Sequence, residues 1–213
     1  MSSAECQRST PMLEPPQYAL VEHGSRTRPE AEKFIANRFA ESFGARIDAF
    51  MPRLFTLRSP NGDICGAFGL RSTPHRLFVE QYLDAPIERT IAAATGGAIE
   101  RLGIVEVGHF SGAIPGAMRA LIVLLIARLH REGFTWVTFT GTTQLRNAFR
   151  RLGLIPLDIG AAKLEAIPPD ARPAWGRYYE NAPRVLAGRI RDGFPALASH
   201  GDVHDALAQS TSI

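Results

Sequence analysis

Cysteine and long apolar runs are both scarce in this sequence. Its 213 residues include two cysteines, Cys6 and Cys65, which are too few for a disulfide framework, so we expect free thiols in a reducing compartment. The longest apolar run, residues 120–127, is far too short to cross a bilayer. Residues 1–10 carry no apolar segment of the kind that a signal peptide needs. The sequence therefore predicts a cytoplasmic protein without a membrane span.

Motifs for metal binding and for serine hydrolysis are missing as well. The six histidines are scattered without ligand spacing, so we predict no metal site. No Gly-x-Ser-x-Gly sequence is present, which argues against a serine lipase. The formal net charge of +3 is too small to indicate a nucleic-acid-binding protein.

Length and composition are typical of one soluble domain with tails. Hydrophobic residues make up 45% of the chain and charged residues 21%, which is ordinary for a globular protein. Residues 1–27 are polar and interrupted by prolines, and residues 195–213 are small and polar, so we expect both to be flexible tails. The single domain is then expected over residues 28–194.

The first half of that domain contains a helix pattern and a hairpin signal. Residues 28–45 predict a helix, with Pro29 suited to its first turn. Asn61-Gly62 lies between two alternating runs, residues 54–58 and 64–71, and this arrangement predicts a β-hairpin. Residues 77–83 are expected to be extended and residues 87–94 to form a short helix.

Residues 104–153 predict a strand, a turn, a long helix, a second strand and a short helix. The strand is expected at 104–110 and the helix at 115–131. The second strand is expected at 134–140, and Thr142 or Thr143 is suited to cap a helix that ends at Gly153. A hairpin followed by a strand–helix–strand unit is typical of a mixed α/β sheet.

After Leu154, prolines interrupt any long element. Trp175, Tyr178 and Tyr179 cluster in what we expect to be a short helix. Aromatic residues at this density either pack in a core or line an apolar pocket, and both alternatives stay open.

The turn between the first strand and the long helix has the composition of an anion-binding loop. Glycines precede a helix N-terminus, where backbone N–H groups and the positive end of the helix dipole attract anions. The alternative is an ordinary crossover without a ligand. The candidate phosphate-binding residues are Gly112, Ala113, Pro115, Gly116, Ala117, Met118 and Arg119.

Strand, turn, helix, strand and then Asn147-Ala148-Phe149-Arg150-Arg151-Leu152-Gly153-Leu154 resembles the acyl-CoA-binding half of GNAT acyltransferases. Over roughly residues 28–194 the chain also resembles the thermostable hemolysin family, and its layout is similar to that of the acyl-homoserine-lactone synthases. The stretches that carry this resemblance are Phe50-Met51-Pro52, residues 77–88, 104–108, 136–141 and 145–154, and Trp175-Gly176-Arg177-Tyr178-Tyr179.

The resemblance implies an α/β fold with a GNAT-like mixed, mostly antiparallel central sheet flanked by helices. It also implies acyl-CoA or acyl-phosphopantetheine as co-substrate, bound by the glycine-containing turn and by Asn147 and Phe149. The chain departs from the GNAT pattern at Ala113 and Met118 in the turn, and at Phe149, where a tyrosine is usual.

Acylation of an amine needs a base and donors for the developing oxyanion. Glu106 is the candidate base, because it stands alone in an apolar strand where burial raises the pKa of a carboxylate. The alternative is a buried ion pair with Arg71 or Arg101. The backbone of Val107 and Gly108 is the candidate source of oxyanion donors if the strand splays as in GNAT proteins.

Three further residues are candidates for binding the acceptor. Glu80, which is also a second catalytic candidate, and Asp84 are placed to hold a cationic amine, or else are surface charges. His109 follows Glu106 by three positions, so in a regular strand it points to the opposite face. The resemblance implies Asn at this position, and we count His109 among the substrate-binding candidates only.

Arginines dominate the charge of the second half of the domain. Residues 100–153 contain seven arginines, three glutamates and no lysine. Arg146, Arg150 and Arg151 are candidates for contact with an acidic acyl carrier protein, or else form a solvated helix face.

These patterns and the resemblance predict an N-acyltransferase that moves an acyl group from acyl carrier protein or acyl-CoA to the amine of an amino acid or a similar small molecule. A membrane-active hemolysin is one alternative, although no long amphipathic segment is visible. A catalytically inactive GNAT-like binding module is the other, and it rests on Phe149.

Overall fold

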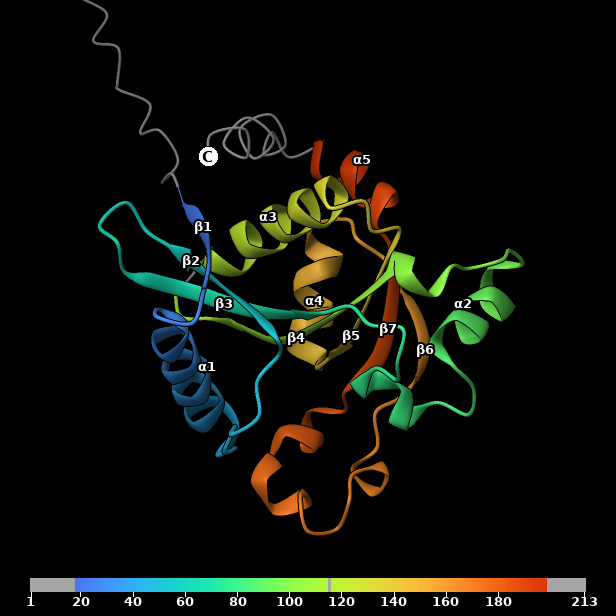
Figure 1. The fold of residues 1–213 in the computed structure, drawn as a ribbon, viewed down its shortest axis with the longest axis horizontal. Helices are drawn as coiled ribbons and strands as arrows, with labels where there is room; N and C mark the ends of the chain where they lie inside the picture. The colour runs from blue at the N-terminus through green and yellow to red at the C-terminus, as the bar shows by residue number, and fades with distance from the viewer. Residues whose placement is uncertain (1–17, 115, 199–213) are drawn as a thin grey trace, which may run out of the picture.

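The computed structural model describes residues 18–114 and 116–198, which include a seven-stranded mixed sheet (Figure 1). The strand order is β1-β2-β3-β4-β5-β7-β6, and all neighbours are antiparallel except β4 and β5. The strands are β1 (Ala19–Glu22), β2 (Arg53–Arg58), β3 (Ile64–Arg71), β4 (Ile104–Gly112), β5 (Trp136–Gly141), β6 (Leu157–Ala161) and β7 (Arg184–Arg189).

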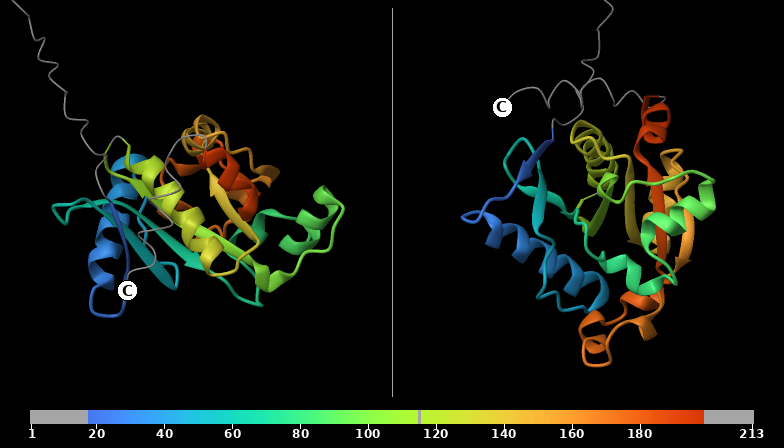
Figure 2. Two further views of the ribbon diagram at one scale, coloured as in Figure 1. Left: turned by 90° about the horizontal axis from the view of Figure 1, so that it is seen from above. Right: turned by 45° about the vertical axis from the view of Figure 1, so that its right-hand side comes forward.

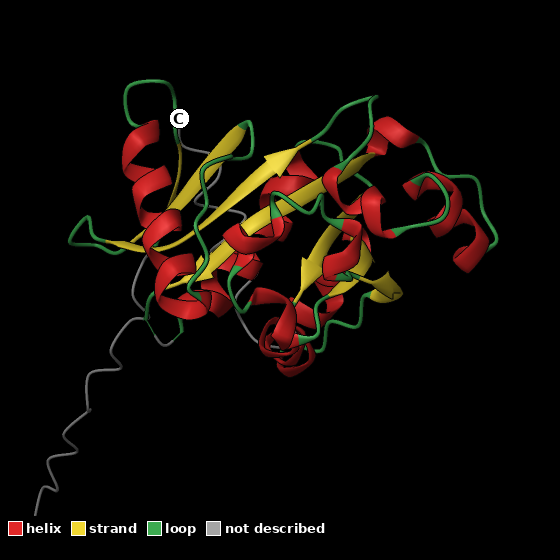
Figure 3. Ribbon diagram, turned by 90° about the horizontal axis from the view of Figure 1, so that it is seen from below, coloured by secondary structure: helices red, strands yellow, loops and turns green. Residues whose placement is uncertain are grey.

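Helices cover both faces of this sheet (Figures 2 and 3). Helix α1 packs on one face through Ile35 and Phe39, and helix α3 packs on the other through Leu121 and Leu125. The α-helices are α1 (Arg28–Phe43), α2 (Ile87–Thr95), α3 (Ala117–Arg131), α4 (Thr143–Arg151) and α5 (Gly193–Ala198). The short 3-10 helices are η1 (Phe78–Tyr82), η2 (Arg101–Gly103), η3 (Leu164–Ala166), η4 (Arg172–Trp175), η5 (Tyr178–Asn181) and η6 (Ile190–Asp192).

The parallel pair β4–β5 is formed along only half of β4. Helix α3 connects the two strands, as a parallel pair requires, and their register runs from Ile104 opposite Trp136 to Val107 opposite Phe139. Beyond this point β4 continues to Gly112 in contact with β3, while β5 continues to Gly141 in contact with β7. The two strands therefore splay apart in the middle of the sheet.

The main elements of residues 28–153 match the sequence predictions. The helices at 28–45 and 87–94 are confirmed as α1 and α2, and the hairpin as β2–β3. The long helix begins at Ala117 in the described part of the chain. Thr142 caps α4, because its Oγ1 accepts a hydrogen bond from the Leu145 N–H at 3.4 Å.

Three segments differ from the predictions. Residues 78–82 form η1 and not an extended segment, because buried carboxylates of Glu80 and Glu106 accept hydrogen bonds from backbone N–H groups of this stretch. The region after Leu154, expected to be irregular, contributes strands β6 and β7. Strand β1 lies within the stretch expected to be a tail and pairs with β2. Cys6 and Pro115 lie outside the described residues.

Candidate active site

A cavity of about 1130 Å³ lies where β4 and β5 splay apart. Its lining comes from β4 and β5 and from helices on both faces of the sheet, including Phe39 of α1, Ile122 of α3 and Phe149 of α4. A cavity of this size with a largely apolar lining and a few polar groups is typical of a small-molecule site. The gap between the strands therefore places one site in contact with both layers of helices.

Glu106 lies on β4 in the wall of this cavity, with an exposed fraction of 1%. Its Oε1 accepts a hydrogen bond from the Val79 N–H at 2.9 Å, and its Oε2 accepts one from the Phe78 N–H at 3.0 Å. Burial raises the pKa of Glu106, and these two N–H groups and the charge of Arg71 partly oppose the rise. A raised pKa brings a carboxylate closer to the range of a useful base.

The expected alternative for Glu106, a close ion pair, is only weakly present. Arg71 Nη1 lies 3.8 Å from Glu106 Oε2, beyond hydrogen-bond distance. Arg101 instead binds Glu80 and Glu88. Glu106 is therefore held mainly by neutral N–H donors, while the guanidinium of Arg71 lines the cavity beside it.

Glu80 has a different environment, although it is also buried. It accepts hydrogen bonds from the N–H groups of Leu77 and Ile87 and from Arg101, whose Nη1 and Nη2 lie 2.8 and 2.7 Å from its oxygens. Burial alone raises the pKa of Glu80, but Arg101 and the two N–H groups outweigh it and lower the pKa to about 2. Glu80 does not line the cavity, and we read it as the anchor of the segment between η1 and α2.

Asp84, the other candidate for a cationic amine, is exposed and is also not part of the cavity wall. The structure therefore does not bring Glu80 and Asp84 together with Glu106 at one site.

His109 lies on the same face of the sheet as Glu106, so the prediction of opposite faces is wrong. The β3–β4 register shifts between Ala67 and Gly69, and His109 has a φ of 56°. Such a β-bulge adds one residue to the strand and reverses the alternation beyond it. As a result His109 contacts Phe39 of α1, and its Nε2 accepts a hydrogen bond from the Met51 N–H at 3.1 Å.

The turn before α3 also reaches the cavity. Among the candidate phosphate-binding residues, Gly112, Ala113, Gly116 and Met118 line it. Ala117 is buried in the core instead, Arg119 is not part of the wall, and Pro115 lies outside the described residues. Gly116 precedes α3 with a φ of 84°, and no side chain among the described residues caps this helix end. The Ala117 N–H donates to the Ile114 carbonyl at 3.2 Å, so the N–H groups that follow it in the first turn of α3 are the ones that suit an anionic ligand.

Of the candidate residues on helix α4, only Phe149 and Arg151 line the cavity. Phe149 lines it and stacks on Phe139 with ring centroids 5.0 Å apart. Arg151 also lines it, whereas Asn147 and Arg150 are exposed and are not part of the cavity wall. Arg146 donates hydrogen bonds to the Ala182 carbonyl and to Thr143 Oγ1.

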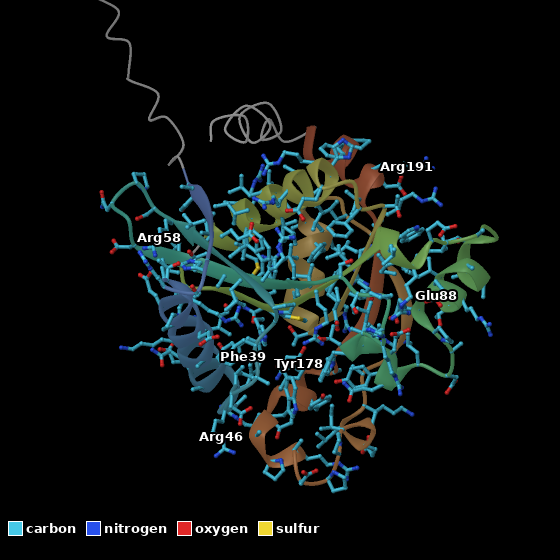
Figure 4. The ribbon with its side chains drawn as sticks, viewed as in Figure 1. Phe39, Arg46, Arg58, Glu88, Tyr178 and Arg191 are labelled. Carbon is cyan, nitrogen blue, oxygen red and sulfur yellow. The ribbon has the colours of Figure 1, made fainter. Side chains whose placement is uncertain are left out.

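Two groups of residues line the cavity although their sequence pattern did not assign them to a site. The first is an aromatic wall, in which Phe39 stacks on Tyr178 with centroids 6.3 Å apart and Trp175 lies 5.3 Å from Tyr178. The second is a set of arginines, Arg38, Arg46 and Arg71. Figure 4 shows Phe39, Arg46 and Tyr178 on one side of the sheet, with Glu88 away from them on α2 at the right of the picture.

Phe34, Phe39 and Phe43 of α1 belong to one packed cluster. Phe39 and Phe43 also border the cavity. The same holds for Trp175 and Tyr178, which both pack against other rings and line the cavity. Both alternatives for this aromatic cluster are therefore realised at once.

The family model described as thermostable hemolysin matches residues 21–194 of this chain. The chain belongs to the thermostable hemolysin family. A comparison with curated proteins found no match.

Solved structures resemble this member of the family along most of its length. FeeM, an N-acyl amino acid synthase from uncultured soil microbes, is 16% identical with a TM-score of 0.57, and the match covers 85% of this chain and 96% of FeeM. TofI in an apo form gives 16% identity and a TM-score of 0.56 with the same coverage. The AHL synthase LasI gives 12% and 0.54, covering 83% of this chain and 91% of LasI.

These matches and the strand order establish the expected GNAT-like fold, with its mixed, mostly antiparallel sheet. In the described part of the chain no helix is long and apolar enough to cross a membrane. Nor do three or more metal-binding side chains gather at one place among those residues.

We predict that Glu80 makes the stability of the protein depend on acid pH. Its pKa in the folded state is about 2, below the ordinary value of 4.5, so its stabilising effect is complete above about pH 4.5 and is lost as the pH falls towards 2. Urea unfolding should show Glu80→Gln to be less stable than the wild type at neutral pH, with a difference that shrinks between pH 4.5 and 2.

The exposed carboxylate variant Glu165→Gln is the matched control and should change stability little at any pH. If the stability difference between the wild type and Glu80→Gln stayed constant across this pH range, the lowered pKa of Glu80 would be contradicted.

Proposed function

We propose that the protein is an N-acyltransferase that transfers an acyl group from a thioester donor, acyl-CoA or acyl carrier protein, to the amine of an amino acid or a similar small molecule. The observation that carries this proposal is the cavity at the β4–β5 splay, which joins a buried carboxylate, Glu106, to a glycine-containing turn at a helix N-terminus. FeeM is an N-acyl amino acid synthase and LasI an AHL synthase, and their similar folds support the same reaction class.

The donor is proposed to bind along the turn and α3. The turn around Gly116 offers backbone N–H groups to the phosphate of coenzyme A or of a phosphopantetheine arm, apart from those of Ala113 and Ala117, which donate to the carbonyls of Cys65 and Ile114. Beyond it the lining is apolar, with Ile122 and Leu125 of α3 facing the same space as Phe139 of β5. Such a lining suits an acyl chain, because burial of each methylene contributes about 0.8 kcal/mol.

The reaction proposed for this site is direct attack of the amine on the thioester. Glu106 removes a proton from the acceptor ammonium, and the free amine then attacks the carbonyl carbon. The oxyanion that forms is stabilised by backbone N–H groups at Val107 and Gly108. The tetrahedral intermediate collapses to an amide and expels the thiolate, which takes up a proton, so no other reactant is consumed.

The charges of the cavity favour an acceptor that carries a carboxylate. Arg38, Arg46 and Arg71 line its α1 side, where Asp48 and Glu106 are the acidic residues. Arg71 makes no hydrogen bond to Glu106 at 3.8 Å, and so its guanidinium can bind an incoming carboxylate. Because Glu80 and Asp84 do not line the cavity, we now favour a zwitterionic amino acid over a purely cationic amine.

An acidic carrier protein would meet the arginine face of α4. Arg150 is exposed at the end of this helix, and Arg151 is exposed and lines the cavity. This arrangement fits a carrier that docks there and passes its phosphopantetheine arm into the cavity. We therefore propose that acyl transfer be assayed with both donors.

Glu106→Gln should separate a catalytic base from a structural carboxylate. If Glu106 is the base, acyl transfer per folded molecule should fall by about 10²- to 10⁴-fold, and the loss should shrink at higher pH, where more of the amine is deprotonated. The melting temperature should also fall somewhat, because the new amide NH₂ group faces one of the two N–H donors. A variant that melts at a lower temperature but keeps full activity per folded molecule would show that Glu106 is not the base.

Gly116→Asn should weaken donor binding. Asparagine tolerates the positive φ of 84°, so the backbone is kept while a side chain enters the proposed phosphate site. We expect at least a tenfold loss of coenzyme A affinity by titration calorimetry.

Gly96→Asn is the matched control, since Gly96 also has a positive φ and open space around it but lies outside the cavity. Equal coenzyme A affinity for the two variants would rule out the turn as the phosphate site.

Arg71→Gln should weaken binding only of acceptors with a free carboxylate. A charge-assisted hydrogen bond contributes about 1.5–3 kcal/mol, so KM for active L-amino acids should rise about 10- to 100-fold. KM for the corresponding amino-acid amides should stay unchanged.

Arg58→Gln, at an arginine outside the cavity, should change neither KM. The carboxylate site would be excluded if Arg71→Gln raised KM equally for the acids and the amides.

A further inference from the structure

His109 occupies an unusual backbone conformation at the point where the sheet opens. It lies two residues beyond Val107, the last residue of β4 that pairs with β5. Its φ of 56° is in the left-handed region, and the described chain has a single other non-glycine residue with positive φ, Ala182. Bulges and residues with such backbone strain are frequent next to active sites, where they aim a side chain.

The imidazole ring of His109 is held in one orientation by its neighbours. Its Nε2 accepts the Met51 N–H at 3.1 Å, and its ring centroid lies 6.2 Å from that of Phe39 and 5.6 Å from that of Phe50. A neutral imidazole that accepts a hydrogen bond at Nε2 carries its proton on Nδ1. Within the described residues this Nδ1–H has no hydrogen-bond partner.

The ring of His109 also borders the cavity. His109 is half-buried and lines the cavity, and its Nδ1 is not among the sealed and unpaired side-chain nitrogens found in the described chain, which are Arg38 Nε and Arg101 Nε. Burial, together with the charges of Arg71 and Arg28, lowers the pKa of His109 to about 4. The ring is therefore neutral at pH 7 and can donate a hydrogen bond from Nδ1.

We propose that His109 donates its Nδ1–H to the carbonyl oxygen of the acyl thioester and stabilises the oxyanion formed when the amine attacks. This inference rests on the proposed function and adds a side-chain donor to the backbone groups of β4. A neutral donor suits this step, because the hydrogen bond strengthens as negative charge develops on the oxygen and no proton is transferred to it. When the intermediate collapses, the oxygen becomes the amide carbonyl and His109 is unchanged.

The other use of the ring is structural, since it also holds the Met51 N–H. Two substitutions separate these uses. His109→Asn places an amide NH₂ near the position of Nδ1, tolerates a positive φ, and is too short to reach Met51. His109→Gln is long enough to reach Met51 but has no donor near the position of Nδ1.

For acyl transfer per folded molecule, we expect His109→Gln to lower kcat by about 10²- to 10³-fold, the typical effect of losing one oxyanion donor. His109→Asn should stay within about tenfold of the wild type. Thermal unfolding should show the opposite order, with His109→Asn less stable than His109→Gln. Equal kcat for the two variants, or a loss that follows melting temperature, would overturn the proposal.

An infrared readout tests the hydrogen bond without turnover. The carbonyl stretch of octanoyl-coenzyme A carrying carbon-13 at its carbonyl should move further to lower frequency on binding to the wild type and to His109→Asn than on binding to His109→Gln, where only the backbone donors remain. An equal shift in the wild type and in His109→Gln would refute the His109 donor even if acyl transfer is observed. A larger shift in the wild type than in His109→Gln, with no transfer to any amine, would instead retain the donor and reject the proposed function.

Discussion

Strands β4 and β5 are hydrogen-bonded to each other only from Ile104 to Val107 on β4, and the site depends on where this pairing stops. A parallel pair that continued to Gly112 would close the middle of the sheet and satisfy all its backbone groups. Strand β4 stays paired with β3, and β5 stays paired with β7. The sheet can therefore open between β4 and β5 while each strand remains hydrogen-bonded on its outer side. The opening places Glu106, His109 and the turn before α3 in the wall of one cavity.

Two buried carboxylates near this opening acquire different properties from their partners. Glu80 is bound by Arg101 and by backbone N–H groups, so its pKa falls to about 2. Glu106 is bound by neutral N–H groups with Arg71 at a distance of 3.8 Å, so burial dominates and its pKa rises. When the surroundings of two titratable groups shift their pKa values in opposite directions, the two groups often have different roles. Here Glu80 accepts the Leu77 N–H at the start of η1, and the next two N–H groups, of Phe78 and Val79, hold Glu106.

The side chains of the cavity wall bear on which acceptor the protein would use. One fold can serve enzymes with different acceptors, so the acceptor has to be argued from the site. Arginines on the α1 side and an aromatic wall that includes Trp175 and Tyr178 are the observations behind the proposed acceptor, an amine with a carboxylate and an apolar part.

The sequence alone determined the local elements of residues 28–153 and the position of the buried Glu106 in a strand, because these follow from periodicity, turn residues and capping. It did not determine η1, whose backbone conformation depends on carboxylates from elsewhere in the chain. Strands β6 and β7 were missed because prolines obscure them and only their neighbours in the sheet order them. The bulge at His109 was missed for a related reason: it is an irregularity of pairing with β3, and a strand's own residues predict only regular alternation. Tertiary structure therefore decided which side chains share the cavity.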